Sequence, residues 1–119
     1  MSFEVIFYET ENGHQPAREF IDSLDVHMQA KIVKAIKLLE ERGNALREPY
    51  SKSLTDGIME LRVQFGSNIS RVLYFFYYDG QIVLTHGFVK KTQKTPATEI
   101  ERAQRYRADY LKRNGESRQ

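Results

Sequence analysis

The sequence predicts an α+β domain in which helices pack on a small antiparallel sheet. Three observations support this prediction. Apolar and polar residues alternate over residues 58–65, which is the period of a strand. Apolar residues recur at helical spacing over residues 28–39. Asp79-Gly80 separates two apolar runs and is a strong hairpin signal.

The first three elements are expected to be a strand and two helices. Alternation over residues 3–9 predicts the strand. Pro16 suits the first turn of a helix over residues 16–24, because its missing N–H would have no partner there. Asp25 can cap a second helix that runs to about Arg42, with Gly43 as its stop signal. The apolar residues that pack these helices into a hairpin are Phe20, Ile21 and Ile32.

Residues 44–57 are expected to form a loop, because they hold a proline, two serines and an Asp-Gly pair. Three strands follow, over residues 58–65, 69–78 and 81–89. The turns between them are short, so the strands form an antiparallel meander. The middle strand is apolar on both faces, which predicts that both faces are covered.

A last helix is expected after the meander, with Thr95 as its cap and Pro96 as its first residue. The predicted order is therefore β-α-α-β-β-β-α, without repeats or linkers. Residues 1–113 are expected to form one domain and residues 114–119 a polar tail.

The composition excludes several kinds of site. The 119 residues include no cysteine, which excludes disulfides and cysteine-ligated zinc. We find no metal motif and no Ser-His-Asp set, and we expect neither metal nor cofactor. The longest apolar run, residues 72–78, is too short to span a bilayer. The first residues lack the basic region of a signal peptide, so a cytoplasmic location without membrane contact is expected.

Charge is distributed unevenly along the chain. Residues 1–57 hold seven Lys/Arg and ten Asp/Glu, whereas residues 58–119 hold eleven and six. The basic second half is typical of proteins that bind phosphate-rich or acidic partners. A basic surface exposed only to solvent explains the same count equally well.

Two arginines are expected to approach each other on the meander. Arg71 opens an apolar strand, and Arg62 lies on the polar face of the strand before it. The short turn between these strands brings the two guanidiniums together, where they repel unless an anion or a carboxylate lies between them. A phosphate is the functional interpretation, and an ion pair with Glu60 is the structural alternative.

A second basic cluster lies in residues 86–96. Lys90, Lys91 and Lys94 follow a strand and precede a helix, whose N-terminus adds unpaired N–H groups. Lys52, in the preceding loop, is expected to reach the rim of the same cleft. His86 falls in step with Ile82 and Leu84, which favours a buried, hydrogen-bonded histidine over a general acid or base.

Four stretches carry a resemblance to a known family. They are MELR (59–62), SRVLYFF (70–76), LTHGFVKKTQKTP (84–96) and EIERAQRY (99–106). With the helical hairpin before them, they resemble the phage-derived toxin family of the RelE/HigB superfamily. The resemblance implies a RelE/ParE-like fold and a type II toxin. Its expected activity is metal-independent, ribosome-dependent mRNA cleavage, by attack of a 2′-hydroxyl on the adjacent phosphate, which inhibits translation.

The resemblance also implies roles for individual residues. Arg62, Arg71 and Lys91 match the catalytic cations. Lys52, Lys90 and Lys94 are expected to bind RNA, and Lys90 is an alternative to Lys91. Residues 95–97 stand where some relatives carry a tyrosine or histidine, so the general acid and base stay open.

The expected partners are mRNA, the ribosome and a HigA-like helix-turn-helix antitoxin that binds in a heterotetramer. Two other functions are compatible with the same residues. One is a ParE-like gyrase poison, which shares the fold without the chemistry. The other is a catalytically inactive basic binding module.

Overall fold

The computed structural model describes residues 3–90 and 94–115, in which five strands form one sheet. The strands are β1 (Glu4–Phe7), β2 (Ser51–Ser53), β3 (Met59–Phe65), β4 (Asn68–Phe76) and β5 (Gln81–Val89). Their order across the sheet is β1-β5-β4-β3-β2. The predicted meander of β3, β4 and β5 is confirmed. It is extended at its edges by β2, which is antiparallel to β3, and by β1, which is parallel to β5.

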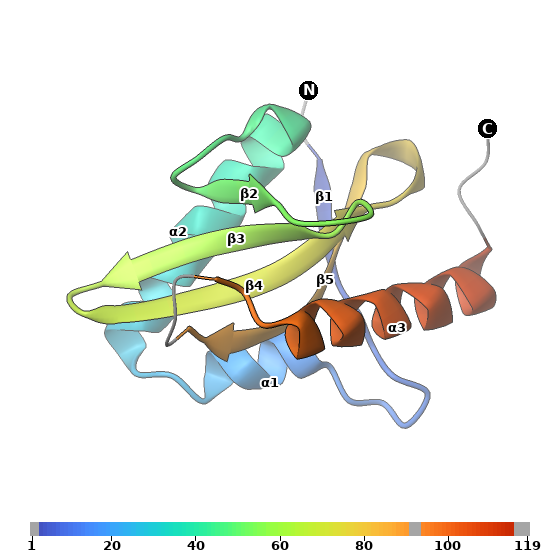
Figure 1. Ribbon diagram of the computed structural model, residues 1–119, viewed down its shortest axis with the longest axis horizontal. Helices are drawn as coiled ribbons and strands as arrows, with labels where there is room; N and C mark the ends of the chain where they lie inside the picture. Colours follow the sequence, from blue (N-terminus) through green and yellow to red (C-terminus); the bar gives the residue numbers. More distant parts are fainter. Residues whose placement is uncertain (1–2, 91–93, 116–119) are drawn as a thin grey trace.

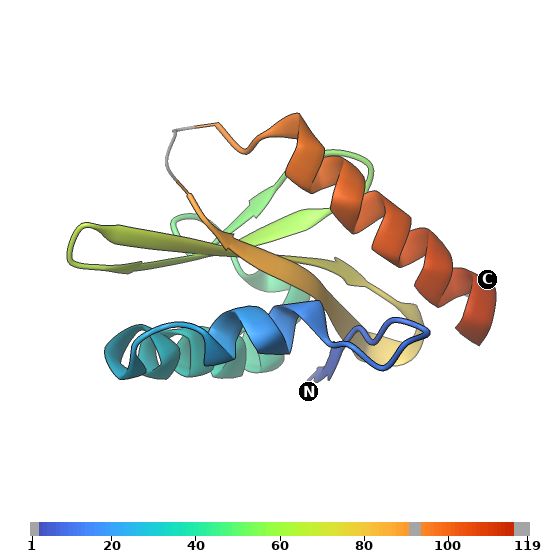
Figure 2. The ribbon, with the colours of Figure 1, turned by 90° about the horizontal axis from the view of Figure 1, so that it is seen from below.

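Helices cover both faces of this sheet. The helical hairpin of α1 (Pro16–Asp22) and α2 (Val26–Arg42) lies on one face, and α3 (Ala97–Asn114) crosses the other (Figure 1). Figure 2 shows the three layers from the side, with the β3–β4 hairpin extending beyond the N-terminal end of α3. The α+β class is therefore confirmed, with an N-terminal strand and a C-terminal helix. Within the described residues, no helix is long and apolar enough to cross a membrane.

The predicted ends of the helical hairpin are also confirmed. Pro16 begins α1. The Asp25 side chain caps α2 by accepting hydrogen bonds from the backbone N–H groups of His27 and Met28, at 2.8 and 3.0 Å. Gly43 ends α2 with a φ of 51°, and a Cβ at this position would lie 2.0 Å from the Phe3 ring. Only glycine fits such a positive φ and so close a ring without a shift.

The apolar core is divided by the sheet into two layers. On the face of α1 and α2, buried residues include Leu39, Leu61, Val72, Tyr74 and Leu84. On the α3 face they include Tyr8, Leu73, Phe75, Val83 and Ala103. Since β4 contributes to both layers, it is the central strand covered on both sides, as its continuous apolar run predicts.

A bulge in β5 changes which face its residues occupy. Leu73 pairs with His86, whereas Tyr74 pairs with Leu84, so Thr85 has no partner in the ladder. Leu84 packs under α1 and α2, but beyond the bulge Phe88 packs in the α3 layer. The prediction that His86 continues the face of Ile82 and Leu84 is therefore wrong, because one extra residue reverses the alternation.

The sequence prediction also missed β2, which lies inside the predicted loop of residues 44–57. Ser51 is 3% exposed, and its hydroxyl lies 2.5 Å from the hydroxyl of Tyr74 on β4. The strand has three residues, two of them exposed serine and lysine, so it carries no apolar alternation. Pairing with β3, rather than local preference, determines its conformation.

Candidate functional site

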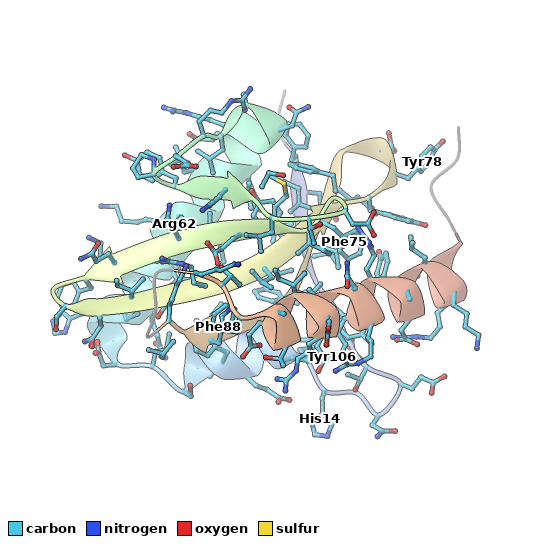
Figure 3. The ribbon with its side chains drawn as sticks, viewed as in Figure 1. His14, Arg62, Phe75, Tyr78, Phe88 and Tyr106 are labelled. Atoms are coloured by element: carbon cyan, nitrogen blue, oxygen red, sulfur yellow. The ribbon has the colours of Figure 1, made fainter. Side chains whose placement is uncertain are left out.

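Arg62 and Arg71 face each other across β3 and β4. Phe65 pairs with Asn68 around the Gly66-Ser67 turn, and this register makes Arg62 the direct partner of Arg71. Directly opposed residues point to the same face of a sheet, which here is the face crossed by α3. The sequence prediction that these guanidiniums come together is confirmed. Figure 3 shows Arg62 on β3, on the part of the sheet that α3 leaves open.

Glu60 is the carboxylate nearest to both arginines among the described residues. Its Oε1 lies 3.3 Å from Arg71 Nε and 3.9 Å from Arg62 Nε. Glu60 is completely buried, Arg71 is 5% exposed, and the Arg62 side chain is 26% exposed. The ion pair with Glu60 that the sequence offered as the structural alternative is therefore present. Glu60 is shared by both arginines, and Arg62 Nη1 also lies 4.0 Å from Oε1 of the exposed Glu48.

Lys90 adds a third cation to this group. It is only 8% exposed, and its Nζ donates a hydrogen bond of 3.4 Å to Thr95 Oγ1. Burial lowers the pKa of Lys90, Glu60 opposes this effect, and the positive charges of Arg71, Arg62 and Lys52 lower the pKa further. Burial likewise lowers the pKa of Arg71, although Glu60 opposes that effect. Because Arg62, Arg71 and Lys90 repel one another, the site favours the binding of an anion between them.

Thr95 has a different role from the one predicted. Its hydroxyl donates a hydrogen bond to Glu60 Oε2. The N-cap position of α3 is Pro96, and no side chain caps the helix there. The expectation of a Thr95 cap with Pro96 as the first helical residue is therefore wrong by one position. The polar pattern identified a helix start, but a partner 35 residues away determines where this hydroxyl points.

A groove of about 1330 Å³ opens beside these cations. Arg62, Arg71 and Lys90 line one part of it, and Lys31 and Lys34 of α2 line another. The remaining lining residues are Ala35, Leu38, Pro49, Tyr50, Val63, Gln64, Ser67 and Ile69. Five cations and, among the described residues, no carboxylate therefore line the groove. Sequence reasoning missed Lys31 and Lys34, although their spacing of three on α2 places them on one face of that helix.

The structure describes two of the other three predicted basic residues. Lys52 is exposed on β2 and pairs with Glu60, so it lies on the same face of the sheet as the arginines. Lys94 is exposed on the segment before α3. Lys91 lies outside the described residues. The structure thus brings together Lys52, Arg62, Arg71 and Lys90.

His86 is buried between β5 and α3, apart from the groove. It is 2% exposed, and its Nε2 donates to Glu99 Oε1 at 2.9 Å, because a carboxylate can only accept. The Tyr106 ring meets the His86 ring edge-on at 5.7 Å. Figure 3 shows Tyr106 on α3 and Phe88 beside the start of that helix. The predicted hydrogen-bonded, buried histidine is confirmed, with α3 rather than the helical hairpin as its neighbour.

Comparison with known proteins identifies the family. A model of the phage-derived Gp49-like proteins (DUF891) matches residues 19–108. The chain belongs to this family. The matched region of this Gp49-like protein includes Glu60, Arg62, Arg71, Lys90 and Thr95. No curated protein shows a significant match to the chain. Within the described residues, no three His, Asp or Glu side chains are grouped so that they could hold a metal ion.

Proposed function

We propose that this Gp49-like protein is the toxin of a type II toxin–antitoxin system, a cytoplasmic endoribonuclease of the RelE/HigB superfamily that cleaves mRNA on the ribosome. One observation carries the proposal: five cations and, among the described residues, no carboxylate line the groove that begins at Arg62 and Arg71. Such a groove attracts a polyanion. Membership of a phage-derived family supports the toxin assignment.

The proposed reaction is attack of a ribose 2′-hydroxyl on the adjacent phosphate. Negative charge develops on the phosphorane oxygens as the new P–O bond forms and the bond to the 5′-oxygen breaks. The products are a 2′,3′-cyclic phosphate and a 5′-hydroxyl. Preorganised cations in a site shielded from water stabilise this charge by more than about 2 kcal/mol per group. Arg62 and Arg71 supply that stabilisation on opposite sides of one phosphate.

The lysines have two roles in this proposal. A cation on the Lys90-Lys91 pair contacts the scissile phosphate, and Lys52 and Lys94 bind the RNA backbone on either side. The lowered pKa of Lys90 favours this amine as the base that takes the 2′-hydroxyl proton, and Lys91 is then the cation at the phosphate. A general acid protonates the 5′-oxygen as its bond to phosphorus breaks.

The proposal is tested by expressing the protein without an antitoxin. We expect growth to stop because translation stops, while replication continues. Mapping mRNA ends after a short induction should give new 5′-hydroxyl ends, and the purified protein should cleave ribosome-bound mRNA without any metal ion beyond the Mg²⁺ that ribosomes require. DNA breaks and an SOS response that precede any loss of translation would indicate a gyrase poison instead. Antitoxin binding without cleavage of any RNA would indicate a binding module.

A further inference from the structure

Glu60 lies beneath the groove rather than in its lining. Its side chain is completely buried, and it is not among the residues that form the groove wall. Burying a carboxylate is costly unless charged or hydrogen-bonding partners surround it. Here the partners are the cations of the candidate site, so the cost of burial is compensated by the same residues that face the groove.

Glu60 contacts neither arginine through a terminal nitrogen, although Arg62 Nη1 also lies 4.0 Å from Oε1 of the exposed Glu48. Both arginines approach Oε1 through Nε, the nitrogen nearest the main chain, at 3.3 Å for Arg71 and 3.9 Å for Arg62. Both arginines also line the groove. A guanidinium held from behind at Nε can direct its two terminal nitrogens to a phosphate, which is the two-pronged contact that arginine makes best.

The second carboxylate oxygen connects this pair to the segment before α3. Oε2 accepts the hydrogen bond of Thr95, and Thr95 Oγ1 in turn accepts a hydrogen bond from Lys90 Nζ. A single chain of contacts therefore runs from Arg71 through Glu60 and Thr95 to Lys90. Glu60 Oε1 and Arg71 Nε are both buried, yet their contact is an ion pair without a hydrogen bond. A pair that served stability alone would be expected to close that hydrogen bond.

We propose that Glu60 is a positioning residue, which holds Arg62 and Arg71 by their Nε atoms and, through Thr95, fixes Lys90 against the same phosphate. This inference rests on the proposed function. Glu60 does not touch the RNA, because it is fully buried and outside the groove lining. Its effect is to orient cations before the phosphorane forms, and misplacing such groups by about 1 Å can reduce a rate a hundredfold.

Glu60→Gln tests this role with a side chain of the same shape. The variant lacks the charge that holds the guanidiniums, so kcat for RNA cleavage should fall at least about tenfold. Binding of an uncleavable 2′-deoxy analogue of the RNA should stay equal or become tighter, because the cluster gains one positive charge. Loss of binding and kcat in equal proportion, or unchanged kcat in a protein with a lower melting temperature, would overturn the proposal.

Thr95 provides a matched pair of variants. Thr95→Val keeps the shape and removes the hydroxyl, whereas Thr95→Ser keeps the hydroxyl. We expect kcat to fall several-fold in the valine variant and to stay within about twofold of the wild type in the serine variant, since only the serine hydroxyl can still bond both Glu60 and Lys90. Equal activity of the two variants would remove Thr95 from the chain of contacts.

A readout without RNA separates this inference from the proposed function. The Nε–H of buried Arg71 should give an NMR signal that exchanges slowly with water, and exchange should accelerate in Glu60→Gln. If the wild-type protein cleaves no RNA but the signal responds in this way, the proposed function fails and the positioning contact stands. If RNA is cleaved and the signal does not respond, Glu60 does not hold Arg71 and the inference fails alone.

Discussion

Arg71 combines burial with access to the groove. A buried ion pair can stabilise or destabilise a protein, because the attraction between the two charges is opposed by the loss of their hydration. Here the pair with Glu60 lies beneath a groove that is lined by Arg71 and four other cations and, in its described lining, by no carboxylate. The structural alternative and the functional interpretation of this residue are therefore compatible: one edge of the guanidinium contacts Glu60, and the side chain also lines the groove.

Replacing Arg71 with Ala should reduce mRNA cleavage by about a hundredfold or more, because the lost charge acts most strongly as the phosphorane forms. The melting temperature should also fall, since Glu60 stays buried and loses the nearer of its two arginine partners. Arg71→Lys should recover only part of the activity, because an ammonium cannot make the two-pronged contact. Cleavage and thermal unfolding are measured on the same purified variants.

Arg107→Ala is the matched control, because Arg107 forms an ion pair with Asp56 at 2.8 Å away from the groove lining. Its cleavage rate should equal that of the wild type. An Arg71→Ala protein that is destabilised but fully active would remove Arg71 from the catalytic group.

At the scale of single elements, the two long helices are fixed by different means. The start of α2 is capped by Asp25, a local signal that the sequence shows directly. The helix α3 has no side-chain cap, and within its described length only Ala103 is fully buried. Its position depends on aromatic contacts with the sheet, such as the Tyr8–Tyr106 stack at 4.7 Å, and on the His86–Glu99 hydrogen bond.

Asp25→Ala should destabilise the protein by about 1 kcal/mol, the usual cost of a lost N-cap. Urea denaturation measures the change. Asp22→Ala, which removes a carboxylate from the end of α1 and leaves the cap in place, serves as the control. Equal loss in both variants would mean that charge, rather than the cap, is responsible.

Lowering the pH should weaken the packing of α3 on the sheet, because His86 of β5 is buried against this helix. Burial lowers its pKa below the ordinary 6.5, against the opposing effect of Glu99 and with the help of Arg102 and Arg105 on α3. The unfolded chain therefore takes up a proton near pH 6.5 that the folded chain does not, so stability is present above that pH and falls as the pH drops below it. The slope of stability against pH between 7 and 5 should be shallower in His86→Gln. Identical slopes would contradict the assignment.

The sequence predicted elements best where the signal was local. The Asp25 cap, the Gly43 stop and the Asp79-Gly80 turn each depend on a few neighbouring residues, and each lies where it was expected. The sequence prediction failed where contact with a residue far along the chain determines the local structure. No pattern in β2 indicates that it pairs with β3, and nothing before Thr85 indicates that β5 contains a bulge. Alternation can reveal a strand but not an interruption within it.

At the scale of the whole molecule, the site shows the same difference between local signals, which the sequence reveals, and tertiary contacts, which it does not. The facing of Arg62 and Arg71 follows from a two-residue turn and was predicted. The contribution of α2 to the groove was not, because the distance from Lys31 and Lys34 to the arginines depends on how α2 packs under the sheet. The link from Thr95 to Glu60 is also tertiary.

The concentration of cations in one groove predicts how the molecule would bind an antitoxin under the proposed function. We expect the antitoxin to cover the groove with an acidic segment, and the association rate should fall steeply between low and high salt, because screening weakens electrostatic steering. Stopped-flow measurements at several salt concentrations test this. Lys31→Gln combined with Lys34→Gln should reduce the salt dependence, whereas Lys112→Gln, outside the groove, should not. A rate that is independent of salt would contradict the prediction.

The parallel pairing of β1 with β5 affects how the protein is made. β1 leaves the ribosome first, yet its partner residues, Gln81–Leu84, are synthesised more than seventy positions later. Pairings between such distant segments form slowly, because a long loop must close before the contact compensates for it. The arginines on β3 and β4 are also translated before β5, so the sheet that supports them is still incomplete when they are made. Under the proposed function, the nascent chain should stay inactive until most of it has emerged, which would give an antitoxin an interval in which to bind it as it folds.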